Sequence, residues 1–226
     1  GYQDIPALER ITIPMFVSVI PKNAFNGCPK IKEIEINPNK TKFEQNNLSN
    51  IPSLEHLIID SSTTSINQKD LSIFRNFKKI TIHCLVNSIE NNAFSDFSSL
   101  TKVEIPLSVS SIGNKAFYNC SSLDLEIPSS LKTIGKSAFF GCSSLTHVNI
   151  PLSVESIGDN AFGKCSKLNK INIDATISKI EDRMLYNCIS LNEITLPSSL
   201  NEIGPKSFEG CNHLREIILP SSITII

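Results

Sequence analysis

The chain has 226 residues, carries 21 lysines and arginines against 22 aspartates and glutamates, and is 40% hydrophobic. This near-neutral balance argues against a nucleic-acid-binding protein, which carries a basic excess, and against a polybasic module that binds membrane surfaces. No run approaches the roughly 20 apolar residues that a membrane span requires, so we expect no membrane insertion within this segment.

One apolar pattern recurs along the whole chain. With residues 100–122 as the template, successive copies start 23 residues apart, except for one interval of 22 residues after Leu123. The copies begin at Leu8, Ile31, Leu54, Phe77, Leu100, Leu123, Leu145, Leu168, Leu191 and Leu214. A fixed period of this length is typical of a solenoid. We therefore predict a single domain with nine full repeats over residues 8–213 and partial repeats at 1–7 and 214–226.

Both ends of the chain fall inside a copy of the repeat. Stacked repeats need polar capping units at their ends, and no such unit is recognisable in the sequence. We therefore expect the chain to be a piece of a longer protein. A reading frame that starts just before Gly1 and stops just after Ile226 would contradict this expectation.

The first part of each copy has the pattern of a short strand. Counted from the first residue of a copy, the fourth and sixth places are apolar and the fifth is polar, as in Val103, Glu104 and Ile105. This alternation predicts a strand with one buried face. Proline cannot donate a ladder hydrogen bond, so a proline at the seventh place marks the strand end. These prolines are Pro14, Pro106, Pro128, Pro151, Pro197 and Pro220. Because all copies run in the same direction, stacking them predicts a parallel sheet.

The second part of each copy begins with an apolar residue at the thirteenth place, and a glycine often follows. Pro21 occupies the glycine place in one copy and cannot have a positive φ, so lack of space or variety of the turn explains the glycines better than a left-handed backbone. These glycines are Gly113, Gly135, Gly158 and Gly204. In residues 114–120, Phe117 and Cys120 lie three places apart, which fits one or two helical turns packed on the strands.

These elements predict an α/β repeat solenoid. The thicker helical turns are expected on the convex side of the stack, and the parallel sheet on the concave side. The pattern L-x-x-I-x-I-P-x-x-V-x-x-I-G-x-x-A-F-x-x-C-x-x, clearest in residues 100–167 and weaker in 31–99 and 177–188, resembles the BspA-like class of leucine-rich repeats. The resemblance covers essentially the whole chain. It implies a curved leucine-rich-repeat horseshoe with an extended protein-binding surface, often found on secreted or cell-surface proteins.

Most of the cysteines share one place in the repeat. The twenty-first place holds Cys28, Cys120, Cys142, Cys165, Cys188 and Cys211. Other copies have Ile51, Phe74 or Phe97 there, so the place is a hydrophobic slot and we expect buried, reduced thiols. Disulfides between adjacent copies are a weaker alternative, because stacked side chains point the same way. We expect Cys84, which follows a strand, to be the exposed thiol.

The sequence has no pattern that indicates catalysis or metal binding. None of the common nucleophile, zinc or phosphate-binding motifs is present, and no Cys-x₂₋₄-Cys pair occurs. His56 and His147 share the third place but lie four copies apart, roughly 19 Å by strand spacing, which is too far for a shared metal. We therefore expect no catalytic residue, no metal site and no cofactor, with catalysis by the repeats themselves as a weak alternative.

The expected binding surface is the concave strand face, to which the third and fifth places project. The candidates are Arg10, Glu33, Glu35, His56, Ile58, Lys79, Thr81, Lys102, Glu104, His147, Asn149, Lys170, Asn172, Glu193, Glu216 and Ile218. Ile58 and Ile218 are expected to be exposed apolar residues, either as anchors for a partner or as isolated surface side chains. A face of varied side chains suits recognition, although a solvated surface without a partner has the same appearance.

The function expected from these observations is that of a non-enzymatic protein-binding module. The family resemblance suggests adhesion or recognition of a host or partner, with a protein or glycoprotein ligand. It also suggests a cell-surface or secreted location, while a cytoplasmic one stays open. The alternative is an intracellular scaffold or targeting segment attached to a separate catalytic domain.

Overall fold

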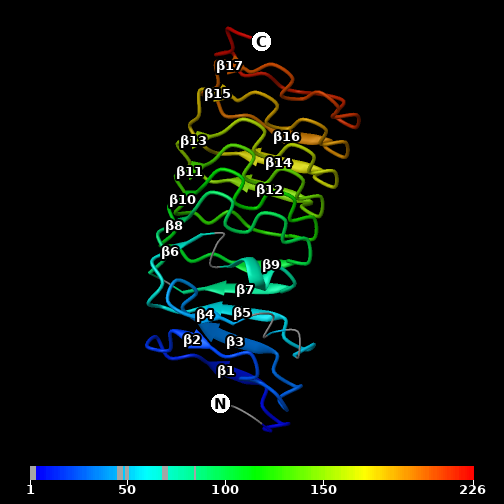
Figure 1. Cartoon of the computed structure of the whole chain (residues 1–226). Coiled ribbons are helices and arrows are strands. Elements are labelled where there is room, and N and C mark those ends of the chain that lie inside the picture. The colour runs from blue at the N-terminus through cyan, green and yellow to red at the C-terminus, as the bar shows by residue number, and fades with distance from the viewer. Residues whose placement is uncertain (1–3, 45–47, 49–50, 68–70, 84) are drawn as a thin grey trace.

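The structure is a computed structural model of the chain, and it describes residues 4–44, 48, 51–67, 71–83 and 85–226. The chain winds into a solenoid whose first and last copies lie at opposite ends of the stack (Figure 1). Residues at equal places in successive copies therefore lie side by side. Cys84, the expected exposed thiol, lies outside the described residues.

One row of parallel strands forms from the predicted strand places. Its members are β1 (Arg10–Thr12), β3 (Glu33–Ile36), β5 (His56–Ile59), β7 (Lys79–Ile82), β9 (Lys102–Glu104), β12 (His147–Ile150), β14 (Lys170–Ile173) and β16 (Glu193–Thr195). The pairing keeps the period of the repeat, so that Ile34 lies opposite Leu57. We call the outer surface carried by these strands the front face. The parallel sheet expected from the sequence is confirmed.

A second row of shorter parallel strands forms around the thirteenth place. It contains β2 (Val19–Ile20), β4 (Lys42–Phe43), β6 (Ser65–Ile66), β8 (Ser88–Ile89), β10 (Ser111–Ile112), β11 (Thr133–Ile134), β13 (Ser156–Ile157), β15 (Lys179–Ile180) and β17 (Glu202–Ile203). The glycines after these strands pack tightly, because a Cβ atom on Gly113 would lie 2.7 Å from the backbone nitrogen of Asn91. Gly113 does not have a positive φ. The explanation by lack of space is therefore confirmed.

The expected helical turns are replaced by a series of turns. The described residues contain one 3₁₀ helix, η1 (Ser72–Phe74), whereas residues 114–119 form consecutive turns. Lys115 and Asn119 have φ values of 55° and 57°, a left-handed conformation that an α-helix excludes. Instead, Phe117 and Asn119 donate their N–H groups to carbonyl groups of the next copy. We call the side formed by residues 114–119 and the equivalent residues of the other copies the turn face. Backbone hydrogen bonds on the turn face thus also join neighbouring copies.

The core is a column of stacked side chains between these rows. The rings of Phe94, Phe117, Phe139 and Phe162 are fully buried, and their successive centroids are 5.1, 5.4 and 5.2 Å apart. Such offset stacking adds to the hydrophobic stabilisation from burial. Each copy alone would expose its ring, so the core exists only through stacking of the copies.

The cysteines line the same core as free thiols. The Sγ atoms of Cys120, Cys142, Cys165 and Cys188 donate to the carbonyls of Phe94, Phe117, Phe139 and Phe162, respectively, at distances of 3.0, 3.1, 3.2 and 3.1 Å. Burial raises the pKa of the Cys120 thiol to about 12 and that of Cys142 well above its ordinary value. The expectation of buried thiols is confirmed for these residues and for Cys28, and Cys211 is half-buried.

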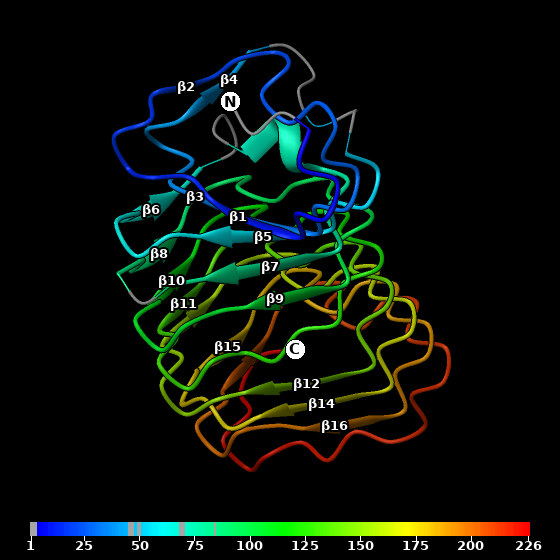
Figure 2. The ribbon, with the colours of Figure 1, turned by 90° about the horizontal axis from the view of Figure 1, so that it is seen from below.

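The front sheet is interrupted at the 22-residue copy. The strand order runs from β1 through β9, and a separate sheet begins at β12 (Figure 2). Leu123 and Leu125 are both buried with one residue between them, whereas Leu100 and Val103 of the preceding copy are buried with two between them. The short copy therefore has one residue fewer between its first buried residue and its strand places. Residues 125–129 form no strand, and a single bridge joins Asp124 to Lys102.

Candidate binding surface

Most of the predicted site residues lie on the front face. The third- and fifth-place residues of the front strands are exposed or half-buried, with one exception described below. The fourth-place residues between them are buried, except for the half-buried Ile194 of β16. The candidates that lie on front strands are Arg10, Glu33, Glu35, His56, Lys79, Thr81, Lys102, Glu104, His147, Asn149, Lys170, Asn172 and Glu193. Glu216 and Ile218 lie beyond β16 in a segment without a strand, and both are exposed. Ile218 is 79% exposed, as expected of an anchor.

The prediction that Ile58 is exposed is wrong, because this side chain is only 5% exposed. Its register places it between Glu35 on β3 and Thr81 on β7. The rings of His56 and His83 reach across this position, with His56 Nε2 2.9 Å from Thr81 Oγ1 and His83 Nε2 3.9 Å from Glu35 Oε1. Ile58 is therefore an apolar contact beneath a polar network and offers no anchor to a partner.

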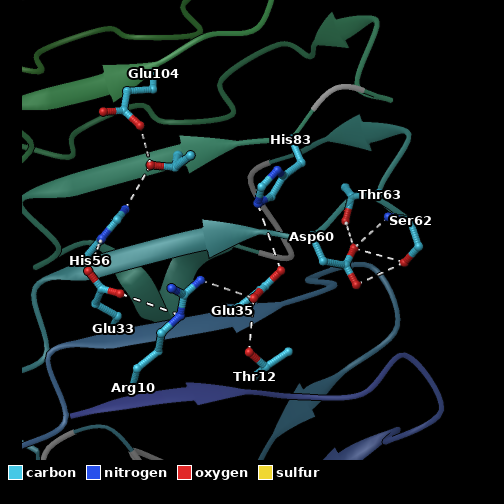
Figure 3. A network of polar contacts seen from close by, with 11 residues as sticks. Arg10, Thr12, Glu33, Glu35, His56, Asp60, Ser62, Thr63, His83 and Glu104 are labelled. Atoms are coloured by element: carbon cyan, nitrogen blue, oxygen red, sulfur yellow. Dashed lines mark hydrogen bonds and ion pairs between the residues drawn. The ribbon is translucent and has the colours of Figure 1, made fainter.

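That polar network connects five successive front strands (Figure 3). Arg10 approaches Glu33 and Glu35 at 3.7 and 3.5 Å. Glu33 also contacts His56 Nδ1 at 3.1 Å. Because the parallel register brings equal places to within roughly 4.8 Å of one another, side chains of neighbouring copies can pair along the face.

The network ends at Glu104 on β9. The hydroxyl of Thr81 donates to Glu104 Oε2 at 2.7 Å, and Lys79 Nζ lies 3.0 Å from Glu104 Oε1. The hydrogen bond from Thr81, followed by that from Lys79, lowers the pKa of the Glu104 carboxyl group to about 2. Glu104 is therefore negatively charged throughout the physiological pH range.

Beyond the interruption, a second set of contacts joins β12, β14 and β16. Asn172 Nδ2 donates to Asn149 Oδ1 at 2.9 Å, and Thr195 Oγ1 donates to Asn172 Oδ1 at 3.2 Å. Lys170 forms an ion pair with Glu193. On both sides of the interruption, polar side chains of the front face are thus bonded to equivalents in adjacent copies.

A groove with a volume of about 1050 Å³ lies at the interruption itself. Residues 124–129 contribute to it from the short copy, β9 and its flanks contribute Lys102 and Glu104, and β12 contributes His147 and Asn149. Leu107, which is 70% exposed, also lines the groove. The lining therefore combines charged, amide and aliphatic groups.

Asp124 and Glu126 in this groove differ from the other acidic residues of the front face. Both side chains are exposed, and within the described residues neither takes part in an ion pair or a side-chain hydrogen bond. By contrast, Glu104, which also lines the groove, is paired: its Oε1 lies 3.6 Å from Lys102 Nζ on the same strand, β9. The prediction from sequence did not include Asp124 and Glu126, although the 22-residue interval was the signal that could have identified them.

One acidic cluster lies away from the front face. Carboxylate oxygens of Asp159, Glu181 and Asp182 lie within 4.8 Å of one another, the only such group among the described residues. Lys136 and Lys179 already form ion pairs with Asp159 and Glu181 at 3.1 and 3.4 Å. These lysines compensate the carboxylate charge, so the cluster does not identify a metal site.

The family comparison agrees with the repeat pattern. A family model described as "BspA type Leucine rich repeat region" matches residues 2–124 and 112–226, with 6 copies. Comparison with curated protein sequences gave no match. Within the described residues, the structure contains no helix with the length and apolar character needed to cross a bilayer.

Three of the solved structures that resemble this fold are of bacterial leucine-rich repeat proteins. A leucine-rich repeat protein from Bacteroides ovatus is 28% identical, with a TM-score of 0.72 over 97% of this chain and 57% of its own length. A leucine-rich repeat protein of T. pallidum is 26% identical, with a TM-score of 0.65 over 71% of this chain and 78% of its own. One from Eubacterium ventriosum, at 22% identity and a TM-score of 0.58, covers 96% of this chain and 62% of its own, and supports the fold alone. The chain thus spans just over half of the Bacteroides protein.

Proposed function

Because the chain belongs to the BspA-type leucine-rich repeat family, we propose that it is a non-enzymatic binding module that recognises a protein or glycoprotein through its front face. The observation that carries this proposal is the contrast between the two sides of the front strands. The fourth place is aliphatic in every front strand and buried in all of them except β16, whereas the third and fifth places differ in charge and shape from copy to copy. A rigid scaffold with one variable face suits recognition of an extended partner surface.

The contacts along the front face favour this role energetically. Binding costs free energy when mobile side chains become ordered at an interface. His56, Thr81 and Glu104 are already held by hydrogen bonds to neighbouring copies. Less conformational entropy is therefore lost when a partner binds them, and their arrangement is fixed before the encounter.

We further propose that the protein acts in adhesion or partner recognition at a cell surface, a location common among proteins with such repeats. An intracellular scaffold attached to a catalytic domain is the second candidate, and the free thiols favour it. Cys120, Cys142, Cys165 and Cys188 are buried free thiols, and unpaired cysteines are typical of reducing compartments. Labelling of intact cells with an impermeant biotin reagent separates the two: surface exposure supports adhesion, and labelling only after lysis supports the scaffold.

Photo-crosslinking in the cells that produce the protein tests the binding face. Benzoylphenylalanine is placed at Asn149 or Thr195 on the front face, and at Lys115 or Lys164 on the turn face as matched controls. We expect protein adducts from the front positions and few from the turn face. Adducts found only from the turn face, or from neither face, would refute the proposal.

A further inference from the structure

We propose that the groove at the 22-residue copy binds an extended segment of the partner protein that carries a lysine or arginine beside an aliphatic residue. This inference rests on the proposed function and gives it a specific site. Its basis is the combination of an interrupted sheet, a groove at the interruption and two carboxylates that have no side-chain partner among the described residues.

The interruption leaves strand edges facing the groove. β12 pairs with β14 on one side and is the edge strand of its sheet, and β9 continues only through the bridge between Lys102 and Asp124. The edge of a sheet presents backbone donors and acceptors that an extended peptide can pair with. The wall formed by β12 has four residues, so it can accommodate about four extended residues, roughly 13 Å.

The charges that line the groove select the side chains of that segment. The lining residues carry one positive charge, on Lys102, and three negative charges. Glu104 is held by Lys79 at 3.0 Å and by Lys102 at 3.6 Å, so the excess negative charge of the groove lies at Asp124 and Glu126. The two residues are separated by one position, with Leu125 buried between them. A guanidinium or ammonium group can bridge carboxylates so placed, and charge-assisted hydrogen bonds are stronger than neutral ones.

An apolar contact completes the site. Leu107 follows β9, lines the groove and is 70% exposed, although a large aliphatic side chain usually gains free energy by leaving water. An aliphatic side chain next to the basic residue of the bound segment would cover Leu107. The groove is thereby complementary to a basic residue and an aliphatic residue on one extended strand.

The chain offers a matched variant that should close the groove. Insertion of threonine after Leu123 restores the 23-residue spacing of the other copies. The added residue allows the short copy to take the normal strand register, which should join β9 to β12 in one sheet. A second variant, Asp124→Asn with Glu126→Gln, removes the two charges with little change in shape. Glu209→Gln, on the turn face, is the control.

The test uses phage-displayed random dodecapeptides selected on the immobilised full chain. Enriched peptides are then synthesised, and their Kd values are measured by fluorescence anisotropy. We expect lysine or arginine beside leucine, isoleucine, valine or phenylalanine in these peptides. We expect about tenfold weaker binding to the charge variant, the effect of one lost charge-assisted pair. The insertion variant should bind at least as weakly, because its closed groove excludes the peptide. Glu209→Gln should change Kd by less than about twofold.

Three results would overturn the inference: no enrichment, enriched peptides without a basic residue, or equal binding to the wild type and the charge variant. Circular dichroism establishes whether each variant folds. If the insertion variant does not fold, the Kd of the charge variant alone tests the inference. The selection uses the isolated chain, so it is independent of the crosslinking experiment. Front-face adducts that persist unchanged in the charge variant would refute the groove and leave the proposed function intact.

Discussion

A Cβ atom added to Gly135 would lie 2.6 Å from the backbone nitrogen of Asn114 in the preceding copy. This distance is far shorter than a van der Waals contact, so the two copies can approach this closely only because Gly135 has no side chain. The backbone of Asn114 also cannot retreat easily, since its N–H group donates to Asn91 Oδ1 at 2.7 Å. The contact fixes the spacing of the copies along the solenoid.

We predict that Gly135→Ala lowers the free energy of unfolding by about 1–3 kcal/mol, the usual cost of overpacking. Lys136→Ala, at the adjacent exposed residue, removes only the exposed ion pair with Asp159 and should change it by less than about 1 kcal/mol. Urea denaturation monitored by circular dichroism measures both values. Equal stability of the glycine variant and the wild type would show that the copies are not in close contact here.

The phenylalanine column gives a second prediction. The ring of Phe139 stacks between those of Phe117 and Phe162 and is fully buried. Phe139→Ala should therefore cost about 3–5 kcal/mol, because it removes a large apolar group and leaves a cavity. Phe140→Ala removes a half-buried ring on the turn face and should cost about 1–2 kcal/mol. If both variants lost the same stability in urea, the column would not be the core of the fold.

The buried thiols give a prediction about pH. Burial raises the pKa of Cys120 from 9.0 to about 12, so in the folded chain this thiol keeps its proton when an unfolded chain would lose it. The contribution of the protonated thiol to the free energy of unfolding is complete below the pKa of Cys120 in the unfolded chain. It is lost as the pH rises from that value towards the pKa in the folded chain. Between about pH 8 and pH 10.5, Cys120 alone should lower the free energy of unfolding by about 2 kcal/mol.

Guanidinium denaturation of the wild type and of Cys120→Ala at these two pH values checks this prediction. The wild type should lose about 2 kcal/mol more than the variant over the interval. Ser121→Ala, at the neighbouring half-buried residue, serves as the control and should follow the wild type. An identical loss in the wild type and Cys120→Ala would mean that the thiol is not buried in the protonated form.

The network on the front face predicts an unusual titration of Glu104. Its pKa of about 2 results first from the hydrogen bond donated by Thr81 and then from Lys79. The ¹³C shift of the Glu104 carboxylate should have its midpoint near this value, and Thr81→Val should move the midpoint up towards the ordinary 4.5. The charged form is favoured in the folded chain, so any stabilisation is present above pH 4.5 and is lost as the pH falls towards 2. If Thr81→Val left the midpoint unchanged, the hydrogen bond from Thr81 would not be the cause of the lowered Glu104 pKa.

The repeat pattern predicted the front sheet because the period fixes which residues lie opposite each other. Ile34 faces Leu57 on the adjacent strand as a direct consequence of a 23-residue spacing. The same reasoning argued against a left-handed conformation at Gly113, since Pro21 holds this place in another copy, and close approach was one of the two explanations that it left. These features depend only on the order of residues within a copy, which the sequence contains completely.

Other features depend on contacts between copies and were not predictable in the same way. Ile58 was expected to be exposed, but the histidines of two copies cover it. The turns around Phe117 were expected to be helical, but donors of the backbone bond to the next copy instead of closing a helix. The groove escaped prediction because the missing residue after Leu123 changes the path of a strand, and the period alone does not describe that path.

We propose that the front face, including the groove, contacts the partner. Amide hydrogen exchange rates of the chain, free and bound to the partner identified by crosslinking, locate the contact. We expect slower exchange on binding in β9, β12 and residues 124–129, with no change in the turn face around residues 114–120. Protection confined to the turn face, with the front strands unchanged, would contradict it.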